Sequence, residues 1–138
     1  MKYLLDTNII SELKKSECNP KVKSFIEKLP QEDIYISVIT IGEISFGIEK
    51  LPAGKKKHEL AIWLYTKIKD WFGDRIILLD FDIMAEWGKI RAKISRSIPF
   101  ADSLIAASAI SNHMTLVTRN IKDFKDFTGM MLINPWEL

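Results

Sequence analysis

Short apolar stretches alternate along this chain with longer stretches in which hydrophobic positions recur every three or four residues. A short apolar or alternating run is typical of a strand, and the three-to-four spacing is typical of a helix that buries one face. The predicted strands cover residues 2–5, 33–37, 76–79, 115–118 and 131–133. The predicted helices cover residues 7–15, 20–29, 38–51, 56–72, 82–95 and 101–112.

Proline, glycine and asparagine residues support the boundaries of several predicted helices. Asn19 followed by Pro20 is typical of a helix start, because asparagine caps free amide groups and proline fits the first helical position. Pro30 ends that helix, and Gly73 separates the long helix over 56–72 from the next apolar run. Pro99 separates the last two predicted helices.

This alternation of strands and helices predicts the fold class. Parallel neighbouring strands need crossover connections, and helices supply these while covering the faces of the sheet. We therefore expect an α/β fold, a three-layer sandwich with a mainly parallel central sheet and helices on both faces. The sequence contains no internal repeat, low-complexity segment or linker rich in proline, glycine or serine, so residues 1–138 are expected to form a single domain.

Composition excludes several classes of protein. Hydrophobic residues make up 47% and charged residues 28% of the chain, which is typical of a globular protein rather than a disordered one. No apolar run approaches the roughly 18 residues of a membrane-spanning helix, and Asp6 and Asn8 interrupt the apolar start too early for a signal peptide. Cys18 is the only cysteine, which excludes intrachain disulfides and cysteine-rich zinc sites, so a reducing, cytoplasmic location is expected.

The distribution of charge is more informative than its total. The 20 basic and 18 acidic residues give a net charge of +2, which is too mild to establish a nucleic-acid partner. The basic residues Arg91, Lys93 and Arg96 lead toward Pro99 and Asp102, and we expect them to contact an RNA phosphate backbone. The tryptophans at positions 63, 71 and 87 fall at helical core positions and are expected to pack rather than to stack on bases.

Polar and acidic side chains gather after the predicted strands. Asp6 follows the first strand, Glu43 lies in the helix after the second, and Asp102 opens the helix rich in small residues. Asn120 and Asp123 follow the strand over 115–118. In parallel α/β sheets ligands bind beyond the carboxyl ends of the strands. We therefore expect these side chains to meet at one edge of the sheet.

A cluster of carboxylates needs a counter-charge. Two carboxylates about 4 Å apart repel by roughly 4 kcal/mol at an effective dielectric near 20, so protons or cations must accompany them. Oxygen ligands without histidine or cysteine favour Mg²⁺, with Mn²⁺ as a substitute, over Zn²⁺. Such ions activate water and stabilise the leaving oxygen of a phosphodiester. No Ser-His-Asp or Cys-His set competes, since His58, His113 and Cys18 lie outside any such motif.

Each of these residues also has a purely structural interpretation. Asp6 can cap a helix, Asp102 can favour a helix dipole, and Glu43 completes a pattern that resembles a capping box. Asp123 belongs to a charged segment expected to be a solvated turn, and Asn120 is a common turn former. Independent caps would scatter over both ends of a sheet, whereas these residues fall at one edge, which favours the joint interpretation.

Five segments together carry a recognisable signature. Leu4–Asn8, Ser37–Ile44, Ile98–Ala107, Leu116–Phe124 and Asn134–Trp136 resemble, in this order, a PIN-domain ribonuclease of the VapC toxin type. The resemblance covers essentially the whole chain. It implies a PIN-like sandwich and a Mg²⁺- or Mn²⁺-dependent endoribonuclease that is the toxin of a type II toxin-antitoxin pair. It also implies inhibition by a small VapB-like antitoxin and a homodimer or a heteromer with that antitoxin.

The resemblance also implies roles for individual residues. Asp6, Glu43 and Asp102 would form the acidic site, with Asp6 and Asp102 as the strongest metal ligands. The fourth acid of the family falls at Asn120, so this chain lacks the full acidic quartet. Either Asp123 takes that place as a metal ligand or a neutral asparagine suffices. A second layer of side chains would orient the carboxylates or water; it comprises Thr7, Asn8 and Thr118.

Three functional hypotheses remain open. In the first, metal at Asp6, Glu43 and Asp102 generates hydroxide for in-line attack on the phosphodiester of a structured RNA such as transfer RNA. In the second, the chain is a catalytically weak module of the same fold that binds RNA or the antitoxin. In the third, Asp6 is the nucleophile of a phosphotransferase, although Thr7 and Asn8 supply no second acid. For the antitoxin, Phe46 and the helix carrying residues 63 and 71 are the candidate contacts.

Overall fold

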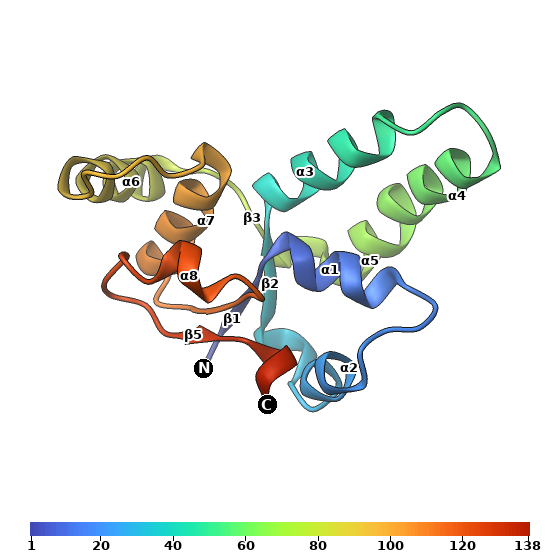
Figure 1. The fold of residues 1–138 in the computed structure, drawn as a ribbon, viewed down its shortest axis with the longest axis horizontal. Helices are drawn as coiled ribbons and strands as arrows, with labels where there is room; N and C mark the ends of the chain where they lie inside the picture. Colours follow the sequence, from blue (N-terminus) through green and yellow to red (C-terminus); the bar gives the residue numbers. More distant parts are fainter.

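A five-stranded parallel sheet runs through the middle of the computed structural model, which describes residues 1–138 (Figure 1). Its strand order is β3-β2-β1-β4-β5, and every neighbouring pair is parallel. The strands are β1 (Tyr3–Leu5), β2 (Ile34–Ser37), β3 (Ile76–Ile77), β4 (Thr115–Val117) and β5 (Leu132–Ile133). The predicted α/β fold with a parallel sheet is confirmed.

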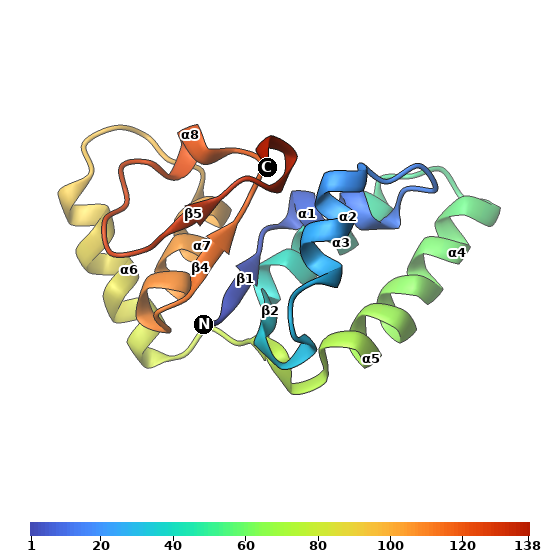
Figure 2. The ribbon, with the colours of Figure 1, turned by 90° about the horizontal axis from the view of Figure 1, so that it is seen from below.

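Helices cover both faces of this sheet. Helices α1 to α5 lie on one side of the sheet and α6 to α8 on the other, as the views in Figures 1 and 2 both show. The helices are α1 (Thr7–Lys14), α2 (Pro20–Glu27), α3 (Val38–Glu49), α4 (Lys55–Trp63), α5 (Lys69–Phe72), α6 (Phe81–Lys93), α7 (Phe100–Ser111) and α8 (Ile121–Phe124). None of them combines the length and the apolar character that crossing a bilayer would require.

The alternation of side chains along the strands divides the hydrophobic core in two. Leu5 and Val117 point into a cluster formed with α1, α2, α3 and the α4–α5 segment. Leu4 and Leu116, one residue earlier on the same strands, point into a second cluster formed with α6, α7 and α8. All four side chains are fully buried, because a central parallel strand is covered on both faces. The three tryptophans predicted to pack do so, at the margins of these clusters.

Side-chain caps fix several helix starts where the sequence predicts them. The amide oxygen of Asn19 accepts a hydrogen bond from the backbone N–H of Lys21 at 2.9 Å, and Pro20 occupies the first position of α2. The hydroxyl of Ser37 accepts from the N–H of Ile39 at 3.0 Å, so α3 begins directly at the end of β2. The cap at Ser37 places the carboxyl end of β2 beside the N-terminus of α3.

The strand predicted over residues 76–79 is wrong in its second half. Only Ile76 and Ile77 pair, with Ile36 and Ser37 of β2. Leu78 and Leu79 lie beyond the edge of the sheet, and their exposed fractions are 67% and 36%. This apolar run looked like a buried central strand, but β3 is an edge strand that ends where its neighbour turns into α3.

Two further elements differ from the predicted pattern. The long helix predicted over 56–72 is continuous, but it changes to π-helical pairing at Leu64–Ile68, between α4 and α5. The charged segment around Asp123, expected to be a solvated turn, forms the single-turn helix α8. Phe124 is 1% exposed and holds this turn against the second core cluster, which explains why a short charged segment becomes helical.

Arg75 joins the end of α5 to the start of β2. Its guanidinium donates hydrogen bonds to the carbonyl oxygens of Gln31, Ile34 and Trp71, and it lies over the ring of Phe72 at 5.6 Å. Three carbonyl groups from two separate segments therefore depend on one side chain. The planar fork of arginine suits such an arrangement better than the single ammonium of lysine.

Replacing Arg75 is expected to destabilise the fold. Arg75→Met removes the donors but keeps an apolar stem, so its free energy of unfolding should fall by about 1–3 kcal/mol. Urea unfolding followed by circular dichroism measures this change. Arg75→Lys keeps the charge and loses the fork, and a wild-type midpoint for this variant would show that the carbonyl contacts do not stabilise the protein.

Candidate active site

The order of the strands creates a crevice at the carboxyl ends of β1 and β4. The chain extends the sheet from β1 to β2 and β3 on one side and then returns to place β4 on the other side of β1. Ligands bind at such a switch point in parallel α/β sheets. A pocket of about 370 Å³ lies there, and it is lined mainly by charged and polar side chains.

Asp6 lies at the centre of this crevice. Its backbone N–H donates to the carbonyl of Val117 at 2.9 Å, which ties the end of β1 to β4. One carboxylate oxygen accepts from the N–H of Thr7 at 2.8 Å and caps α1, and the other accepts from the hydroxyl of Thr118 at 2.7 Å. The residue is only 5% exposed. Asp6 therefore both caps a helix and lines the pocket, so the structural interpretation does not exclude the functional one.

Glu43 reaches the same pocket from α3. Its carboxylate accepts a hydrogen bond from the hydroxyl of Thr7 at 2.5 Å, and the hydroxyl of Thr40 lies 3.1 Å from that of Thr7. Thr7 thus links the first turn of α1 to the second turn of α3. The structure supports the expected part of Thr7 in orienting a carboxylate, and it brings Glu43 to the pocket that Asp6 lines.

Asp102 comes from the opposite side of the sheet. It lies in the first turn of α7 and lines the pocket with Asp6 and Glu43. The structure gives it no hydrogen-bond partner, so its half-buried carboxylate has neither a donor nor a cation beside it. The three acids that the sequence predicted to meet therefore do line one pocket.

The remaining predicted residues frame the crevice on the β4 side. The amide N–H of Asn8 lies 3.4 Å from both the carboxylate of Asp6 and the hydroxyl of Thr118. The hydroxyl of Thr118 also accepts from the backbone N–H of Asn120 at 3.1 Å. Asn120 lines the pocket, whereas Asp123 is exposed on α8 and contributes to the field of the site without lining it.

Burial and neighbouring negative charge raise the pKa values of Asp6 and Asp102. Burial is the main reason that the pKa of Asp102 is raised, to about 6, and the negative charges of Asp6, Asp123 and Glu43 add to it. Burial also raises the pKa of Asp6, although the hydrogen bonds from Thr118 and Thr7 oppose the increase. Shifts of this kind gather at functional sites, because a carboxylate cluster is held together by the fold rather than by its own interactions.

The donor set suits a hard divalent cation. It consists of carboxylate and amide oxygens without histidine or cysteine, which is the chemistry that Mg²⁺ and Mn²⁺ prefer. No three acidic, histidine or cysteine side chains lie close enough to enclose an ion by themselves. Mg²⁺ usually binds through one or two carboxylates and keeps several water molecules, so an open arrangement fits it.

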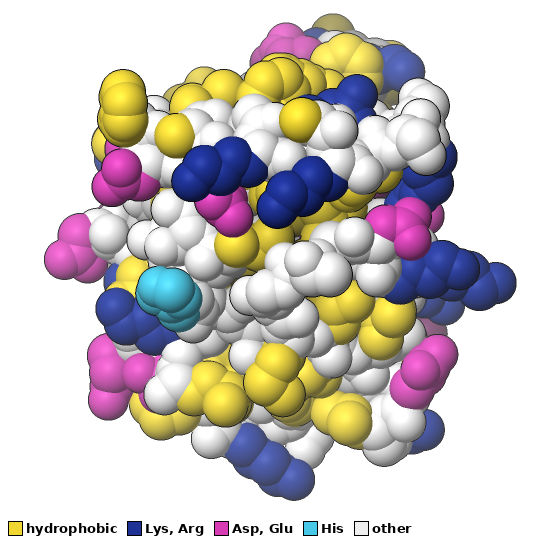
Figure 3. All heavy atoms as spheres, turned by 90° about the vertical axis from the view of Figure 1, so that its left-hand side faces the viewer, with side chains coloured by type: hydrophobic (Ala, Val, Ile, Leu, Met, Phe, Trp, Pro, Cys, Tyr) yellow, Lys and Arg dark blue, Asp and Glu magenta, His cyan; other side chains and the backbone are white.

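The predicted basic group lies apart from the pocket. Arg96 pairs with the carboxylate of Asp126 and donates to the carbonyl of Asp123, and Arg91 is half-buried in α6. Lys93 is exposed. On the α6 side of the molecule, basic side chains are interspersed with acidic and hydrophobic ones (Figure 3). The RNA contact expected here stays a prediction.

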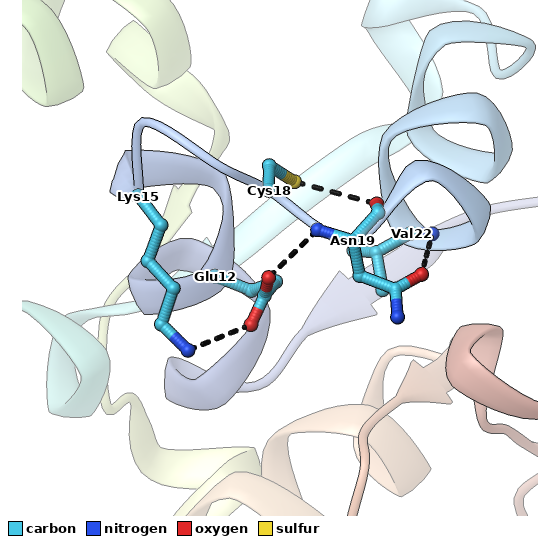
Figure 4. Close-up of polar contacts among 5 residues, drawn as sticks. All are labelled: Glu12, Lys15, Cys18, Asn19 and Val22. Carbon is cyan, nitrogen blue, oxygen red and sulfur yellow. Dashed lines mark hydrogen bonds and ion pairs between the residues drawn. The ribbon is translucent and has the colours of Figure 1, made fainter.

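The pocket also contains charged residues that the sequence analysis did not single out. Lys15 and Arg119 are its two basic residues, and Glu12 is a fourth acid. The carboxylate of Glu12 accepts from the ammonium of Lys15 at 3.0 Å and from the backbone N–H of Asn19 at 2.8 Å (Figure 4). One signal was present: Glu12 and Lys15 have the three-residue spacing that brings side chains together on a helix.

Comparison with known proteins agrees with this geometry. Residues 3–129 match the family model described as the PIN domain. The chain is 34% identical to the VapC ribonuclease Y4jK of Sinorhizobium fredii, covering 97% of each chain. This chain belongs to the PIN-domain family of VapC-type toxins. The identification confirms the resemblance on which the expected ribonuclease activity rested.

Other VapC-type proteins support the same assignment. The chain is 31% identical to the tRNA(fMet)-specific endonuclease VapC of Shigella flexneri, covering 94% of this chain and 95% of that one. The crystal structure of FitAcB from Neisseria gonorrhoeae superposes with a TM-score of 0.90 at 35% identity over 99% of each chain. A toxin-antitoxin complex from Klebsiella pneumoniae superposes with a TM-score of 0.72 at 26% identity, covering 99% of this chain and 100% of that one. The chain is thus a ribonuclease toxin of a toxin-antitoxin pair.

Proposed function

We propose that this VapC-type toxin is a Mg²⁺-dependent endoribonuclease, active also with Mn²⁺, that hydrolyses a structured RNA such as transfer RNA in the cytoplasm. The observation that carries the proposal is the pocket at the switch point of the sheet, where Asp6, Glu43 and Asp102 come from three different elements. The specificity that its Shigella flexneri relative is named for supports transfer RNA as the substrate class.

In this proposal Asp6 and Asp102 are the main ligands of the cation and Glu43 is the third, and water molecules retained by the cation span the gaps between carboxylates that do not enclose it alone. Asn120 offers a neutral oxygen from the end of β4, and Asp123 adds negative charge from α8. When bound, a divalent cation would lower the pKa of water and stabilise the charge that develops on the phosphodiester. The replacement of an acid by Asn120 removes one negative charge from the ligand set and so weakens cation binding before RNA arrives.

The surrounding side chains orient these ligands. Thr118 donates to one oxygen of Asp6, and the backbone of Thr7 donates to the other, so the carboxylate plane of Asp6 is fixed. The hydroxyl of Thr7 does the same for Glu43. Asn8 lies beside Asp6 and Thr118 and accepts from the N–H of Arg119 at 3.3 Å, which joins the loop after β4 to α1. A site held on helix starts and strand ends keeps its geometry without a ligand.

The protein partner in this proposal is a VapB-like antitoxin, and the toxin forms a homodimer or a heteromer with it. Several large hydrophobic side chains are exposed, which favours association with other chains. Phe46 on α3 is 66% exposed, Phe81 on α6 is 85% exposed and Phe100 on α7 is 64% exposed. Phe46 and the helical segment from α4 to α5, which carries Trp63 and Trp71, remain the candidate antitoxin contacts.

The alternative is a catalytically weak module that binds RNA or the antitoxin. Asn120 favours it, because an asparagine in place of an acid lowers the negative charge available to a cation. This alternative predicts RNA binding without metal-dependent cleavage, so one experiment separates the two functions.

That experiment is a time course with total transfer RNA and a second structured RNA. The purified toxin is incubated with Mg²⁺, with Mn²⁺ or with EDTA, and the products are separated on denaturing gels. We expect discrete fragments with either metal and intact RNA in EDTA. Binding of RNA without cleavage under any metal would establish the alternative, and cleavage at an equal rate in EDTA would exclude a metal-dependent mechanism.

A further inference from the structure

We propose that Lys15 and Arg119 form a cationic rim that holds RNA phosphates at the acidic pocket, and that the buried Glu12 positions Lys15 within this rim. The inference rests on the proposed function in taking RNA as the substrate. These two residues are the basic side chains that line the pocket with Asp6, Glu43 and Asp102. Lys15 lies at the end of α1 and Arg119 in the loop after β4, so two separate segments supply the rim.

Glu12 is a buried charge whose two oxygens are both occupied. The residue is 6% exposed, and its carboxylate joins Lys15 at the end of α1 to the backbone of Asn19 at the start of α2 (Figure 4). These hydrogen bonds, first from Asn19 and then from Lys15, lower the pKa of Glu12, and the positive charge of Arg119 also lowers it. A buried carboxylate that is hydrogen-bonded to an ammonium fixes the position of that ammonium better than solvent would.

Lys15 keeps most of its side chain available while it is tethered. Its side chain is 61% exposed, and the ammonium makes one ion pair, with Glu12 at 3.0 Å. An ammonium has three donors, so two remain for an anion at the pocket. Lys15 also follows the last turn of α1, where a cation is favoured by the helix dipole. The ammonium is therefore held in place without being neutralised on every side.

Arg119 is held by its backbone and by a ring rather than by an acid. Its carbonyl accepts from the amide of Asn134 at 3.2 Å, and its guanidinium lies over the ring of Trp136 at 5.0 Å. Its guanidinium forms no ion pair and no hydrogen bond within the protein. A guanidinium stacked on an indole keeps its in-plane donors free, and these match the geometry of a phosphate.

The electrostatics of the pocket explain why such a rim is needed. Three carboxylates face the position that an RNA phosphate must approach, and like charges repel it. Cations at the rim offset this repulsion before the phosphate reaches the acids. Arg96, by contrast, already pairs with Asp126. The geometry therefore places the phosphate contact at Lys15 and Arg119 rather than on α6.

The test measures how RNA affinity depends on salt. In an Asp6→Asn background that keeps the RNA intact, the dissociation constant of a labelled transfer RNA is measured by fluorescence anisotropy over a series of KCl concentrations. Each phosphate contact contributes about 0.7 to 0.9 to the slope of log affinity against log salt. Lys15→Gln and Arg119→Gln should each reduce the slope by about this amount, and the double variant by about twice as much.

Matched variants separate the rim from general charge effects. Lys56→Gln removes an exposed lysine from α4 and should leave the slope unchanged. Lys93→Gln and Arg96→Gln test the basic group at the end of α6 and in the loop that follows it. A wild-type slope in both Lys15→Gln and Arg119→Gln, or a loss confined to the variants on α6, would overturn the inference.

Glu12→Gln tests whether Glu12 positions Lys15, because the two possible outcomes change RNA affinity in opposite directions. Removing a negative charge near the pocket would by itself strengthen RNA binding. If Glu12 positions Lys15, Glu12→Gln in the Asp6→Asn background instead weakens RNA binding about threefold. In the otherwise wild-type enzyme, Glu12→Gln should raise KM while kcat stays nearly constant. Tighter or unchanged binding would show that Glu12 has no such role. Cleavage by the wild-type protein is scored separately, so a toxin that binds through the rim but does not cleave would refute only the proposed function.

Discussion

Asp6→Asn is expected to lower kcat/KM for RNA cleavage by about a hundredfold or more, while the protein keeps its fold. Losing a group that acts directly in catalysis costs on the order of 10²–10⁴ in rate. The change replaces one ligand oxygen by an amide nitrogen that cannot bind a cation. It keeps the helix cap, because asparagine caps helices about as well as aspartate and its carbonyl can still accept from the N–H of Thr7, while its amide can donate to the hydroxyl of Thr118 in place of accepting from it.

The control for this variant is Asp80→Asn. Asp80 caps α6 as Asp6 caps α1, and its carboxylate accepts from the N–H of Ile83 at 2.8 Å, but it lies outside the pocket. The same chemical change there should leave cleavage within about twofold of wild type. Rates are measured on transfer RNA at equal Mg²⁺, with circular dichroism to verify folding. Wild-type cleavage by Asp6→Asn would remove Asp6 from the site.

Asp102→Asn is expected to stop cleavage and, at the same time, to stabilise the metal-free protein. Because the pKa of Asp102 is raised to about 6, the folded state binds its proton more tightly than the unfolded chain does. The free energy of unfolding therefore falls as the pH rises from about 4 to about 6. At pH 7.5 the folded protein bears the full cost of the ionised Asp102 carboxylate. After discounting for solvent screening at this half-buried group, removing the charge should gain about 1 kcal/mol, or about 4 °C in Tm.

The measurement is a pair of thermal melts in EDTA at pH 4 and pH 7.5. Asp102→Asn should match the wild type at pH 4 and exceed it at pH 7.5. Asp82→Asn is the matched control, since Asp82 occupies the first turn of α6 as Asp102 occupies that of α7, but is exposed outside the cluster. We expect no gain from it. Adding Mg²⁺ should raise the Tm of the wild type more than that of Asp102→Asn, and a larger rise in the variant would contradict the ligand assignment.

Hydrophobic periodicity predicts most of this fold because it reports local geometry. The strands Tyr3–Leu5 and Thr115–Val117 lie within the predicted ranges, and α2 begins at Pro20 as its cap indicates. Periodicity fails at Leu78 and Leu79, where an apolar run continues past the last strand neighbour. A strand needs a neighbouring strand as well as suitable residues. The neighbour of β3 is β2, in which Ile36 pairs with Ile76 although the two are 40 residues apart in sequence.

The acidic part of the site could be predicted for a related reason. Asp6, Glu43 and Asp102 follow elements whose order alone brings them to one edge of the sheet. The basic part could not, because Arg91, Lys93 and Arg96 are near Asp102 in sequence, whereas Lys15 and Arg119 are near it in space only after β4 has paired with β1. A tertiary contact of this kind leaves no local pattern.

The pairing of β1 with β4 also sets the stage of translation at which the acidic pocket can form. The carboxylate of Asp6 accepts a hydrogen bond from Thr118, which lies 112 positions later in the sequence, and the backbone N–H of Asp6 donates to the carbonyl of Val117. A ribosome that has made the first hundred residues therefore carries a chain with the earliest acid in place and no pocket around it. The pocket closes only after residues 115–120 have been made and β4 has paired with β1, so a ribosome that is still making the first hundred residues is not exposed to the toxin it produces.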